Sequence, residues 1–156
     1  MGKLVVVKGD AVQGTDTHTV TWLGPPPASL TVPGTADYKY NGTITAMLSA
    51  FVKMGGQPVA LASSQSSLQS GAAGGHLPPL GKNLKPTSPA PTPGSLKLVP
   101  LIVGVGKPNA ASGSSLLTIG KVKVLLDGDK MDTCDGTSSA NSTVAASGQT
   151  FVKCSA

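Results

Sequence analysis

Leu116-Leu-Thr-Ile-Gly-Lys-Val-Lys-Val-Leu-Leu-Asp-Gly-Asp-Lys-Met-Asp-Thr-Cys134 is the stretch that most clearly indicates the fold. Its short apolar runs, separated by glycine, predict two strands joined at a tight turn. After a Ser/Thr-rich connection, the stretch Thr143–Cys154 repeats the order strand, glycine, strand. The C-terminal part of the chain therefore predicts two hairpin-like units, each of which ends at one of the two cysteines.

The composition favours one all-β domain. A chain of 156 residues suits a single domain. Only 12% of the residues are charged and 3% aromatic, whereas glycine (20) and proline (13) are abundant. A core built from so few large apolar residues fits a turn-rich β body better than a helical bundle, and such a body needs help from a partner or a metal. We expect one domain over residues 1–156, with a Pro/Gly/Ser-rich loop over about 63–95.

The charges argue against a nucleic-acid partner. Every basic residue is lysine and every acidic residue is aspartate, with a net charge of +5. The lysines are scattered, arginine is absent and aromatic residues are few, so we expect no nucleic-acid partner.

The sequence has no apolar run of about 20 residues and no signal-peptide pattern at its N-terminus. We expect a protein made in the cytoplasm that leaves, if it does, without the general secretory route.

Three stretches share one local plan, in which an apolar strand, a glycine-centred turn and a second apolar strand follow one another. They are Ala50–Ala62, Leu117–Met131 and Val144–Cys154. This pattern predicts approximate internal threefold repetition.

Two further segments need an interpretation. A short helix over Thr45–Met54 is the alternative to a strand there, because several of its residues are good helix formers. Gly55-Gly56 is a hairpin signal close to Phe51, and it favours the strand. Leu96–Val103 is the most apolar candidate strand, and Pro100 marks it as an edge or bulged strand.

The candidate metal ligands are the two histidines and the two cysteines of the chain, His18, His76, Cys134 and Cys154. Each lies in a separate polar or turn-rich segment. A Cys₂His₂ set closes a tetrahedral zinc site, and such a site contributes folding free energy directly. Because no Cys-x-x-Cys spacing is present, the residues alone leave three readings open: a zinc site, a Cys134–Cys154 disulfide, or no shared role.

Two other kinds of site are disfavoured. Asp127, Asp129 and Asp132 are close in sequence, but Met131 stands at the fifth position of the would-be calcium loop and no Glu stands at the twelfth. A solvated hairpin turn at Asp127-Gly128 is the better reading. The sequence contains no nucleophile elbow, phosphate loop or metalloprotease motif, so we expect a protein that is not an enzyme.

Several motifs, in their order along the chain, resemble PAAR and PAAR-like spike-tip proteins. Gly9-Asp10 followed by His18 resembles the opening segment of this family. The stretch Phe51–Leu61, continuing to Ser64, resembles its strand–Gly–Pro–Ser segment, and Gly75-His76-Leu-Pro-Pro resembles its Pro-flanked histidine. Leu117–Cys134 and Val144–Val152 resemble the closing pair of units. The Pro-Ala-Ala-Arg tetrapeptide itself is missing, and this chain has two cysteines where better-known members have mostly histidine ligands.

The resemblance implies a small cone-shaped body of short β-hairpins at the tip of a contractile injection system, either a type VI secretion machine or a phage tail-like particle. The base of the cone would cap a trimeric β-helical spike protein, with Leu96–Val103 as a candidate part of that base. A structural Zn²⁺ held by His18, His76, Cys134 and Cys154 would staple the apex.

Such a tip would help to pierce the target envelope, with transient contact with the target membrane, and any effector cargo would bind separately. The alternative from another class is a small secreted β-rich binding module or adhesin with a Cys134–Cys154 disulfide.

Overall fold

The computed structural model describes residues 2–28, 30–69, 76–99, 104–134 and 139–155, except for the side chains of residues 76–82. Within these ranges every regular element is a β-strand and there is no helix, which confirms the all-β prediction. The alternative of a helix over Thr45–Met54 is wrong. The β-branched residues before it extend a strand to Ala46, and Met47 then adopts a left-handed φ of 56° that no helix would continue.

The strands are β1 (Lys3–Leu4), β2 (Ala11–Leu23), β3 (Thr31–Ala46), β4 (Lys53–Met54), β5 (Gln57–Pro58), β6 (Gln65–Leu68), β7 (His76–Lys85), β8 (Lys97–Leu98), β9 (Val105–Pro108), β10 (Thr118–Ile119), β11 (Val122–Lys123), β12 (Lys130–Thr133), β13 (Ser142–Ala145) and β14 (Lys153–Cys154). The stretch predicted as one long loop over about 63–95 therefore contains two strands, β6 and β7.

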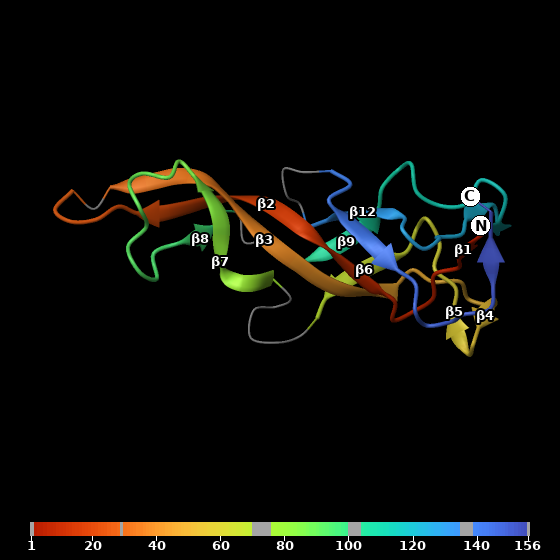
Figure 1. Cartoon of the computed structure of the whole chain (residues 1–156). Helices are drawn as coiled ribbons and strands as arrows, with labels where there is room; N and C mark the ends of the chain where they lie inside the picture. The colour runs from red at the N-terminus through yellow and green to blue at the C-terminus, as the bar shows by residue number, and fades with distance from the viewer. Residues whose placement is uncertain (1, 29, 70–75, 100–103, 135–138, 156) are drawn as a thin grey trace.

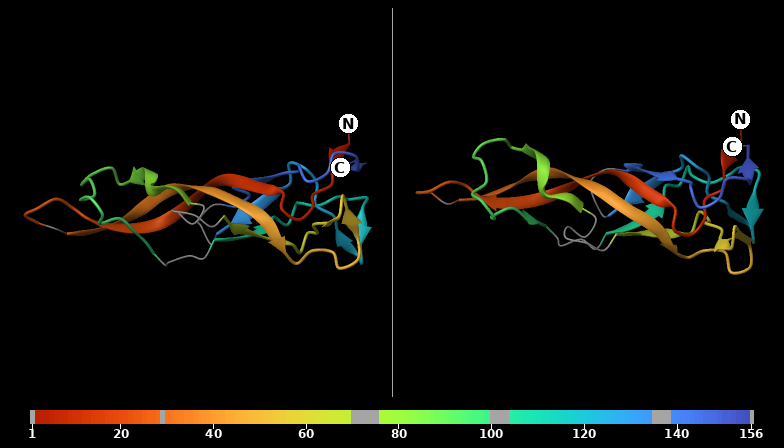
Figure 2. Two further views of the ribbon diagram at one scale, coloured as in Figure 1. Left: turned by 90° about the horizontal axis from the view of Figure 1, so that it is seen from below. Right: turned by 60° about the horizontal axis from the view of Figure 1, so that its bottom comes forward.

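The long hairpin of β2 and β3 is the spine of the molecule (Figure 1). The two strands pair in continuous antiparallel register from Ala11 opposite Thr43 to Leu23 opposite Thr31. Alternate residues of β2 are buried, among them Val12, Val20 and Trp22, as expected for a strand with one face against a core. The hairpin turn forms the narrow end of the elongated molecule, and both chain termini lie at the other end (Figures 1 and 2).

The middle of the molecule is a closed ring of strands. In the eight-stranded sheet the order β3-β6-β9-β12-β13-β2 closes on itself, because β2 also pairs with β3, while β7 and β8 extend the sheet outside the ring. A closed ring of this kind has no free edges and encloses its inward-facing side chains. Its interior holds an apolar cluster that includes Tyr40, Ile44, Met131 and Val144.

At the broad end, three short segments form a cyclic set of backbone hydrogen bonds. Val6 N–H donates to the Leu125 carbonyl (3.0 Å), Leu125 N–H to the Ala60 carbonyl (3.0 Å), and Ala60 N–H to the Val6 carbonyl (2.9 Å). All three residues are fully buried. The flanking residues, Val5 and Val7 with their counterparts in the other two segments, form a separate apolar cluster. The three segments therefore occupy equivalent positions around a common centre.

The turns that follow these segments are also equivalent. In each, a side-chain oxygen accepts a hydrogen bond at 2.8 Å from the backbone N–H three residues earlier: Asp10 from Val7, Ser64 from Leu61, and Asp129 from Leu126. Asp and Ser favour such turns because their short side chains reach the local backbone. The sequences Val5–Asp10, Val59–Ser64 and Val124–Asp129 thus fold as three copies of one unit.

A two-stranded hairpin precedes each copy. The pairs are β4–β5, β10–β11 and β14–β1. The first pair confirms the hairpin predicted at Gly55-Gly56. The third pair differs from the prediction, because Val144 belongs to β13 and pairs with β2, whereas β14 pairs with β1 from the other end of the chain. The third hairpin is therefore assembled from both chain ends.

The Leu96–Val103 segment lies away from the three hairpins. Its described strand, β8, pairs with Val20 and Thr21 of β2, in the narrow half of the molecule, and residues 100–103 lie outside the described part. The expectation that Leu96–Val103 contributes to a docking base stays a prediction. Leu96 and Leu98 of this segment pack on the cluster that contains Trp22 and Tyr38 of the long hairpin.

Candidate metal centre

Asp16, His18 and Cys134 meet inside the molecule. Asp16 and His18 are two residues apart on β2, so both side chains point to the same face of that strand. Cys134 follows β12 directly, and its N–H donates to the Val105 carbonyl (2.9 Å). One ligand atom from each of the three side chains lies within 4.8 Å of the other two, and all three residues are buried.

Hydrogen bonds orient the Asp16 carboxylate. Its Oδ1 accepts hydrogen bonds from the Thr133 hydroxyl and from the Asn141 amide, while its Oδ2 lies 3.9 Å from His18 Nε2. Both Asp16 and His18 are completely inaccessible to solvent. A carboxylate fixed through one oxygen, with the other turned toward an imidazole, is the arrangement that orients ligands in metal sites.

Aromatic side chains surround the group. The rings of His18 and Tyr38 meet edge to face, with centroids 5.6 Å apart. Tyr40 shares a hydrogen bond of 3.0 Å with Ser66, and burial raises the pKa of the Tyr40 phenol to about 12. A carboxylate, an imidazole and a thiol in such a water-poor setting could hold a metal ion.

The structure brings together only some of the four ligands expected from the sequence. His18 and Cys134 come together in this group. The backbone of His76 begins β7 and pairs with Tyr40, a member of the same apolar cluster as Cys134, while the His76 side chain lies outside the described part. His76 therefore stays a predicted ligand.

Cys154 lies in the cluster at the broad end and is not a member of this group. It occupies the second position of β14, as Met54 does in β4 and Ile119 does in β10, and all three side chains pack on the same apolar cluster. Its Sγ lies 3.4 Å from Ser114 Oγ. Cys154 thus fills an apolar position of the third hairpin. The two cysteines, both described, form no disulfide, contrary to the alternative reading of the sequence.

Asp16 was not predicted from the sequence. The available signal was its spacing: Asp16-x-His18 on a strand places a carboxylate beside an imidazole. The sequence analysis instead considered Asp127, Asp129 and Asp132. Their carboxylates accept hydrogen bonds from separate backbone N–H groups, those of Ala146, Leu126 and Ala140 respectively. A turn does form at Asp127-Gly128, but it is not the predicted hairpin turn, because β12 pairs with β9 and β13 and not with the preceding strand. The hydrogen bond from Ala140, followed by those from Asn109 and Ser139, lowers the pKa of Asp132.

The group of Asp16, His18 and Cys134 lies partway along the long hairpin. His18 is followed on β2 by five further residues, which is about 16 Å of strand at the usual rise per residue. The narrow end of the molecule therefore extends beyond the group.

Comparison of the chain with protein-family models, with characterised proteins and with solved structures found no match. In the described part of the chain, no helix has the length and apolar character needed to cross a membrane.

Proposed function

We propose that this protein is a non-enzymatic structural tip that caps a trimeric spike of a contractile injection system. The observation that carries the proposal is the equivalence of the three segments at the broad end, each with its hairpin. A single chain rarely presents a surface with threefold character. A partner built from three identical chains presents three identical contact sites around its axis, and this end offers three matching ones.

The three hairpins also carry equivalent exposed apolar residues. Phe51, Leu116 and Phe151 are 78%, 72% and 66% exposed, and each directly precedes the residue that packs on the broad-end cluster, namely Val52, Leu117 and Val152. Large apolar side chains that face solvent at three equivalent positions favour burial in a protein interface. We assign these three side chains as the anchors that contact the three subunits of the spike.

The metal group would stiffen the part of the tip that lies beyond this base. Zn²⁺ is the metal that a carboxylate, an imidazole and a thiolate suit best, and a closed structural site takes four ligands. We propose Asp16, His18 and Cys134 as three of them and His76 as the fourth. Such a site would tie β2 to the end of β12, two strands that are not neighbours in the ring.

The docking test is a binding experiment with a purified trimeric β-helical spike protein of a contractile injection system from the same source. Size-exclusion chromatography with light scattering should show one chain per spike trimer. Phe51→Asp and Phe151→Asp should abolish the complex, whereas Leu30→Asp, which changes an exposed leucine near the narrow end, should not. Three chains per trimer, or no effect of Phe51→Asp on the complex, would refute the proposed base.

The zinc test compares the two cysteines. Purified protein should contain about one zinc per chain, as should Cys154→Ser, while Cys134→Ser, His18→Ala and Asp16→Ala should lose it. His76→Ala tests the fourth ligand. Zinc loss in Cys154→Ser together with retention in Cys134→Ser would contradict the assignment.

A further inference from the structure

We infer that the uncharged end of the β2–β3 hairpin is a surface that inserts into the interface of an anionic lipid bilayer. This inference adds a lipid contact to the proposed tip, and it does not depend on docking at the base. It rests on four observations about the narrow end, which concern charge, exposed apolar side chains, backbone hydrogen bonding and the position of lysines.

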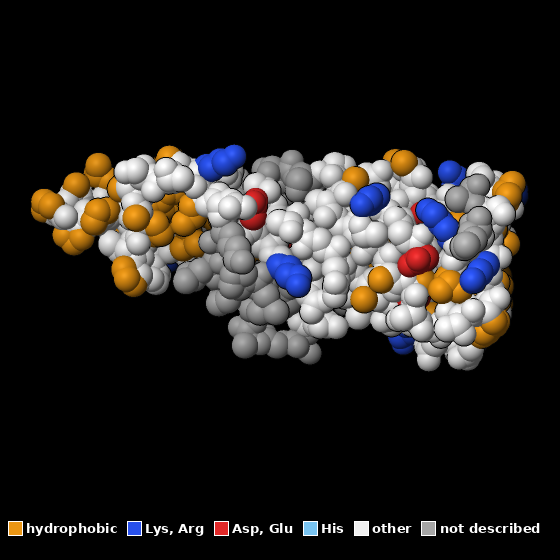
Figure 3. Space-filling view, viewed as in Figure 1, with side chains coloured by type: hydrophobic (Ala, Val, Ile, Leu, Met, Phe, Trp, Pro, Cys, Tyr) orange, Lys and Arg blue, Asp and Glu red, His pale blue; other side chains and the backbone are white. Residues whose placement is uncertain are grey.

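Charge is absent from the whole narrow end. None of the 12 lysines or 7 aspartates falls within residues 17–36, which form the outer part of the hairpin, or within residues 86–96, which run beside it. Figure 3 shows hydrophobic side chains gathered over this end of the visible face, with lysines and aspartates only behind it. A surface without charged groups loses no strong hydration when it enters an apolar phase.

Apolar side chains at this end face solvent. Leu23 and Leu30, on the two sides of the turn, are 43% and 68% exposed, and Pro25, Pro26 and Pro27 between them are exposed as well. Burial of such side chains is favourable at about 25 cal/mol per Å² of apolar surface.

The backbone of the turn suits an apolar environment. Along the hairpin, Trp22 pairs with Val32 and Leu23 with Thr31, and the Gly24 N–H donates to the Leu30 carbonyl (2.9 Å). The three consecutive prolines that follow have no N–H group. Because an unsatisfied backbone donor is costly in a bilayer, a turn made largely of prolines reduces the penalty for insertion.

Lysines stand at the depth where lipid headgroups would lie. Lys97 is opposite Thr21, two residues behind Leu23, and Lys85 is opposite Thr35, four residues behind Thr31. At the rise of a strand these offsets are about 7 and 13 Å, so Lys97 lies within the depth of an interfacial insertion, about 5–10 Å, and Lys85 lies just outside it. An ammonium group there can contact lipid phosphates while the leucines reach the acyl chains.

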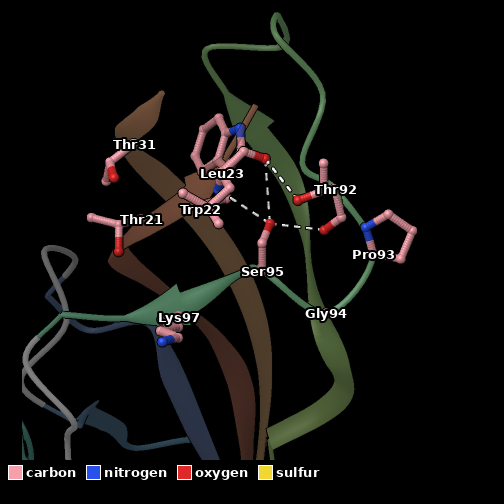
Figure 4. Close-up of a pocket in the computed structure, with 9 residues that line it drawn as sticks. All are labelled: Thr21, Trp22, Leu23, Thr31, Thr92, Pro93, Gly94, Ser95 and Lys97. Atoms are coloured by element: carbon pink, nitrogen blue, oxygen red, sulfur yellow. Dashed lines mark hydrogen bonds between the residues drawn. The ribbon is translucent and has the colours of Figure 1, made fainter. Parts of the chain in front are cut away.

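Figure 4 shows a pocket beside the hairpin end, lined by Leu23 and also by Lys97, Thr21 and Thr31. An ammonium group and two hydroxyls are suitable donors to a phosphate headgroup. The far wall of this pocket is fixed, since Thr92 Oγ1 and Ser95 Oγ both donate to the Leu23 carbonyl (3.1 and 3.4 Å). Trp22 adds a further tie through its Nε1–H, which donates to the Pro89 carbonyl (2.8 Å).

The experiment is flotation of the full chain with vesicles of phosphatidylcholine, with and without phosphatidylglycerol. We expect binding to the anionic vesicles that weakens as salt is added. Leu30→Asp should weaken it about tenfold or more, and Lys97→Ser about fivefold on anionic vesicles alone. Phe51→Asp, the matched control at the broad end, should bind as the wild type does.

Trp22 is the only tryptophan, so quenching of its fluorescence by lipids brominated along their acyl chains reports insertion of the narrow end.

Three results would overturn the inference. They are no flotation of the wild type, equal flotation of Leu30→Asp and wild type, and a loss in Phe51→Asp as large as that in Leu30→Asp. Light scattering without vesicles provides a further test. If the wild type is a dimer and Leu30→Asp is a monomer, this surface binds a second copy of the chain and the lipid inference is wrong. Leu30 is largely exposed, so its replacement should not unfold the protein, and circular dichroism checks this. A protein that binds the spike trimer but not vesicles would contradict the lipid inference and leave the proposed docking intact.

Discussion

At the residue scale, Asp10 connects two parts of the broad end. Its Oδ2 accepts the Val7 N–H (2.8 Å), as in the two equivalent turns, and its Oδ1 also accepts the N–H groups of Ser147 (2.8 Å) and Gly148 (2.7 Å). Asp10 is 1% exposed, so water cannot replace it in the folded protein. Its carboxylate therefore holds the turn of the first copy against the segment that leads to β14.

Asp10→Ala should therefore destabilise the protein more than the equivalent change at Ser64. The alanine leaves three N–H groups without their acceptor, that of buried Val7 and those of exposed Ser147 and Gly148, and we expect a loss of about 2–4 kcal/mol in the free energy of unfolding. Ser64→Ala removes one acceptor of a backbone N–H, that of Leu61, and should cost about 1–2 kcal/mol. Urea unfolding curves measure both losses. Equal losses would contradict the role given to the additional bonds.

A second residue-scale prediction concerns pH. Asp37 accepts hydrogen bonds from Thr17 Oγ1 (2.7 Å) and Asn83 Nδ2 (2.9 Å), which lower its pKa below the usual 3.8. Because the folded pKa is the lower one, Asp37 adds stability above pH 3.8, and that stability disappears as the pH falls through the folded value. Asp37→Asn should be less stable than wild type at pH 7, and the difference should shrink as the pH falls through the lowered pKa of Asp37. Thr17→Val should reproduce part of the effect, whereas a pH-independent difference would refute it.

At the element scale, β2 and β13 approach closely at Gly14, which lies opposite Ser142. A Cβ at Gly14 would stand 2.5 Å from Ser142 Cα and would also overlap the Asn141 carbonyl oxygen. The glycine is needed here because the neighbouring backbone leaves no room for a side chain. The same contact positions Asn141, whose amide donates to Asp16, so the approach of the two strands also orients a proposed metal ligand.

Gly14→Ala should push β13 away from β2, with a loss of stability of about 2 kcal/mol. It should also weaken zinc binding about tenfold, because the Asn141 hydrogen bond to Asp16 is disturbed. Competition with a chromogenic chelator measures the affinity, and thermal unfolding measures the stability. Gly2→Ala is the control, since its Cβ would meet first the Lys153 side chain, at 3.1 Å. Unchanged zinc affinity in Gly14→Ala would show that Asn141 does not support the ligand.

Sequence reasoning recovered the elements that local signals specify. Gly55-Gly56 predicted its hairpin, and the turn-rich composition with short apolar runs predicted an all-β chain. It failed where partners are distant in the chain: β14 pairs with β1, and β8 pairs with β2 in the narrow half. Such long-range pairings leave no local pattern, because the composition of a two-residue strand is the same whichever partner it finds.

The candidate site was predictable to a similar degree. His18 and Cys134 were recognisable as potential ligands by residue type, but Asp16 was not, because aspartates also serve in turns, as Asp10 and Asp129 do. Cys154 was assigned to the site because it is one of the two cysteines of the chain and because the resemblance to spike-tip proteins implied a zinc site. Its position in the third hairpin, equivalent to those of Met54 and Ile119, becomes apparent only when β1 and β14 are seen to pair.

At the scale of the whole molecule, two of the three apolar clusters stabilise separate regions. One fills the ring of strands next to Asp16, His18 and Cys134, and the other fills the broad end. The proposed zinc ligands contact the first of these clusters, through Cys134, and not the one at the broad end. Removal of the zinc should therefore loosen the middle of the molecule without opening the base.

Chelation tests this division. Removal of zinc should lower the Tm by several degrees and should speed amide exchange in β2 and β12, while the segments around Val6, Ala60 and Leu125 keep their protection. Hydrogen exchange followed by mass spectrometry resolves these regions, and added zinc should restore the original pattern. A uniform loss of protection along the chain would show that the two clusters unfold together.

The pairing of β1 with β14 places Lys3 opposite Cys154, and it makes the connectivity of the fold nearly circular. The order of segments around the broad end then does not depend on where the polypeptide is opened. A circular permutant in which a short glycine linker joins residue 155 to residue 2, and which is opened between Gly55 and Gly56, should fold to the same structure and bind zinc as tightly. Gly55 and Gly56 lie in an exposed turn, so opening the chain there removes little packing. Circular dichroism and zinc titration of the permutant would show whether the chain can begin and end at another of the three hairpins and still form the same fold.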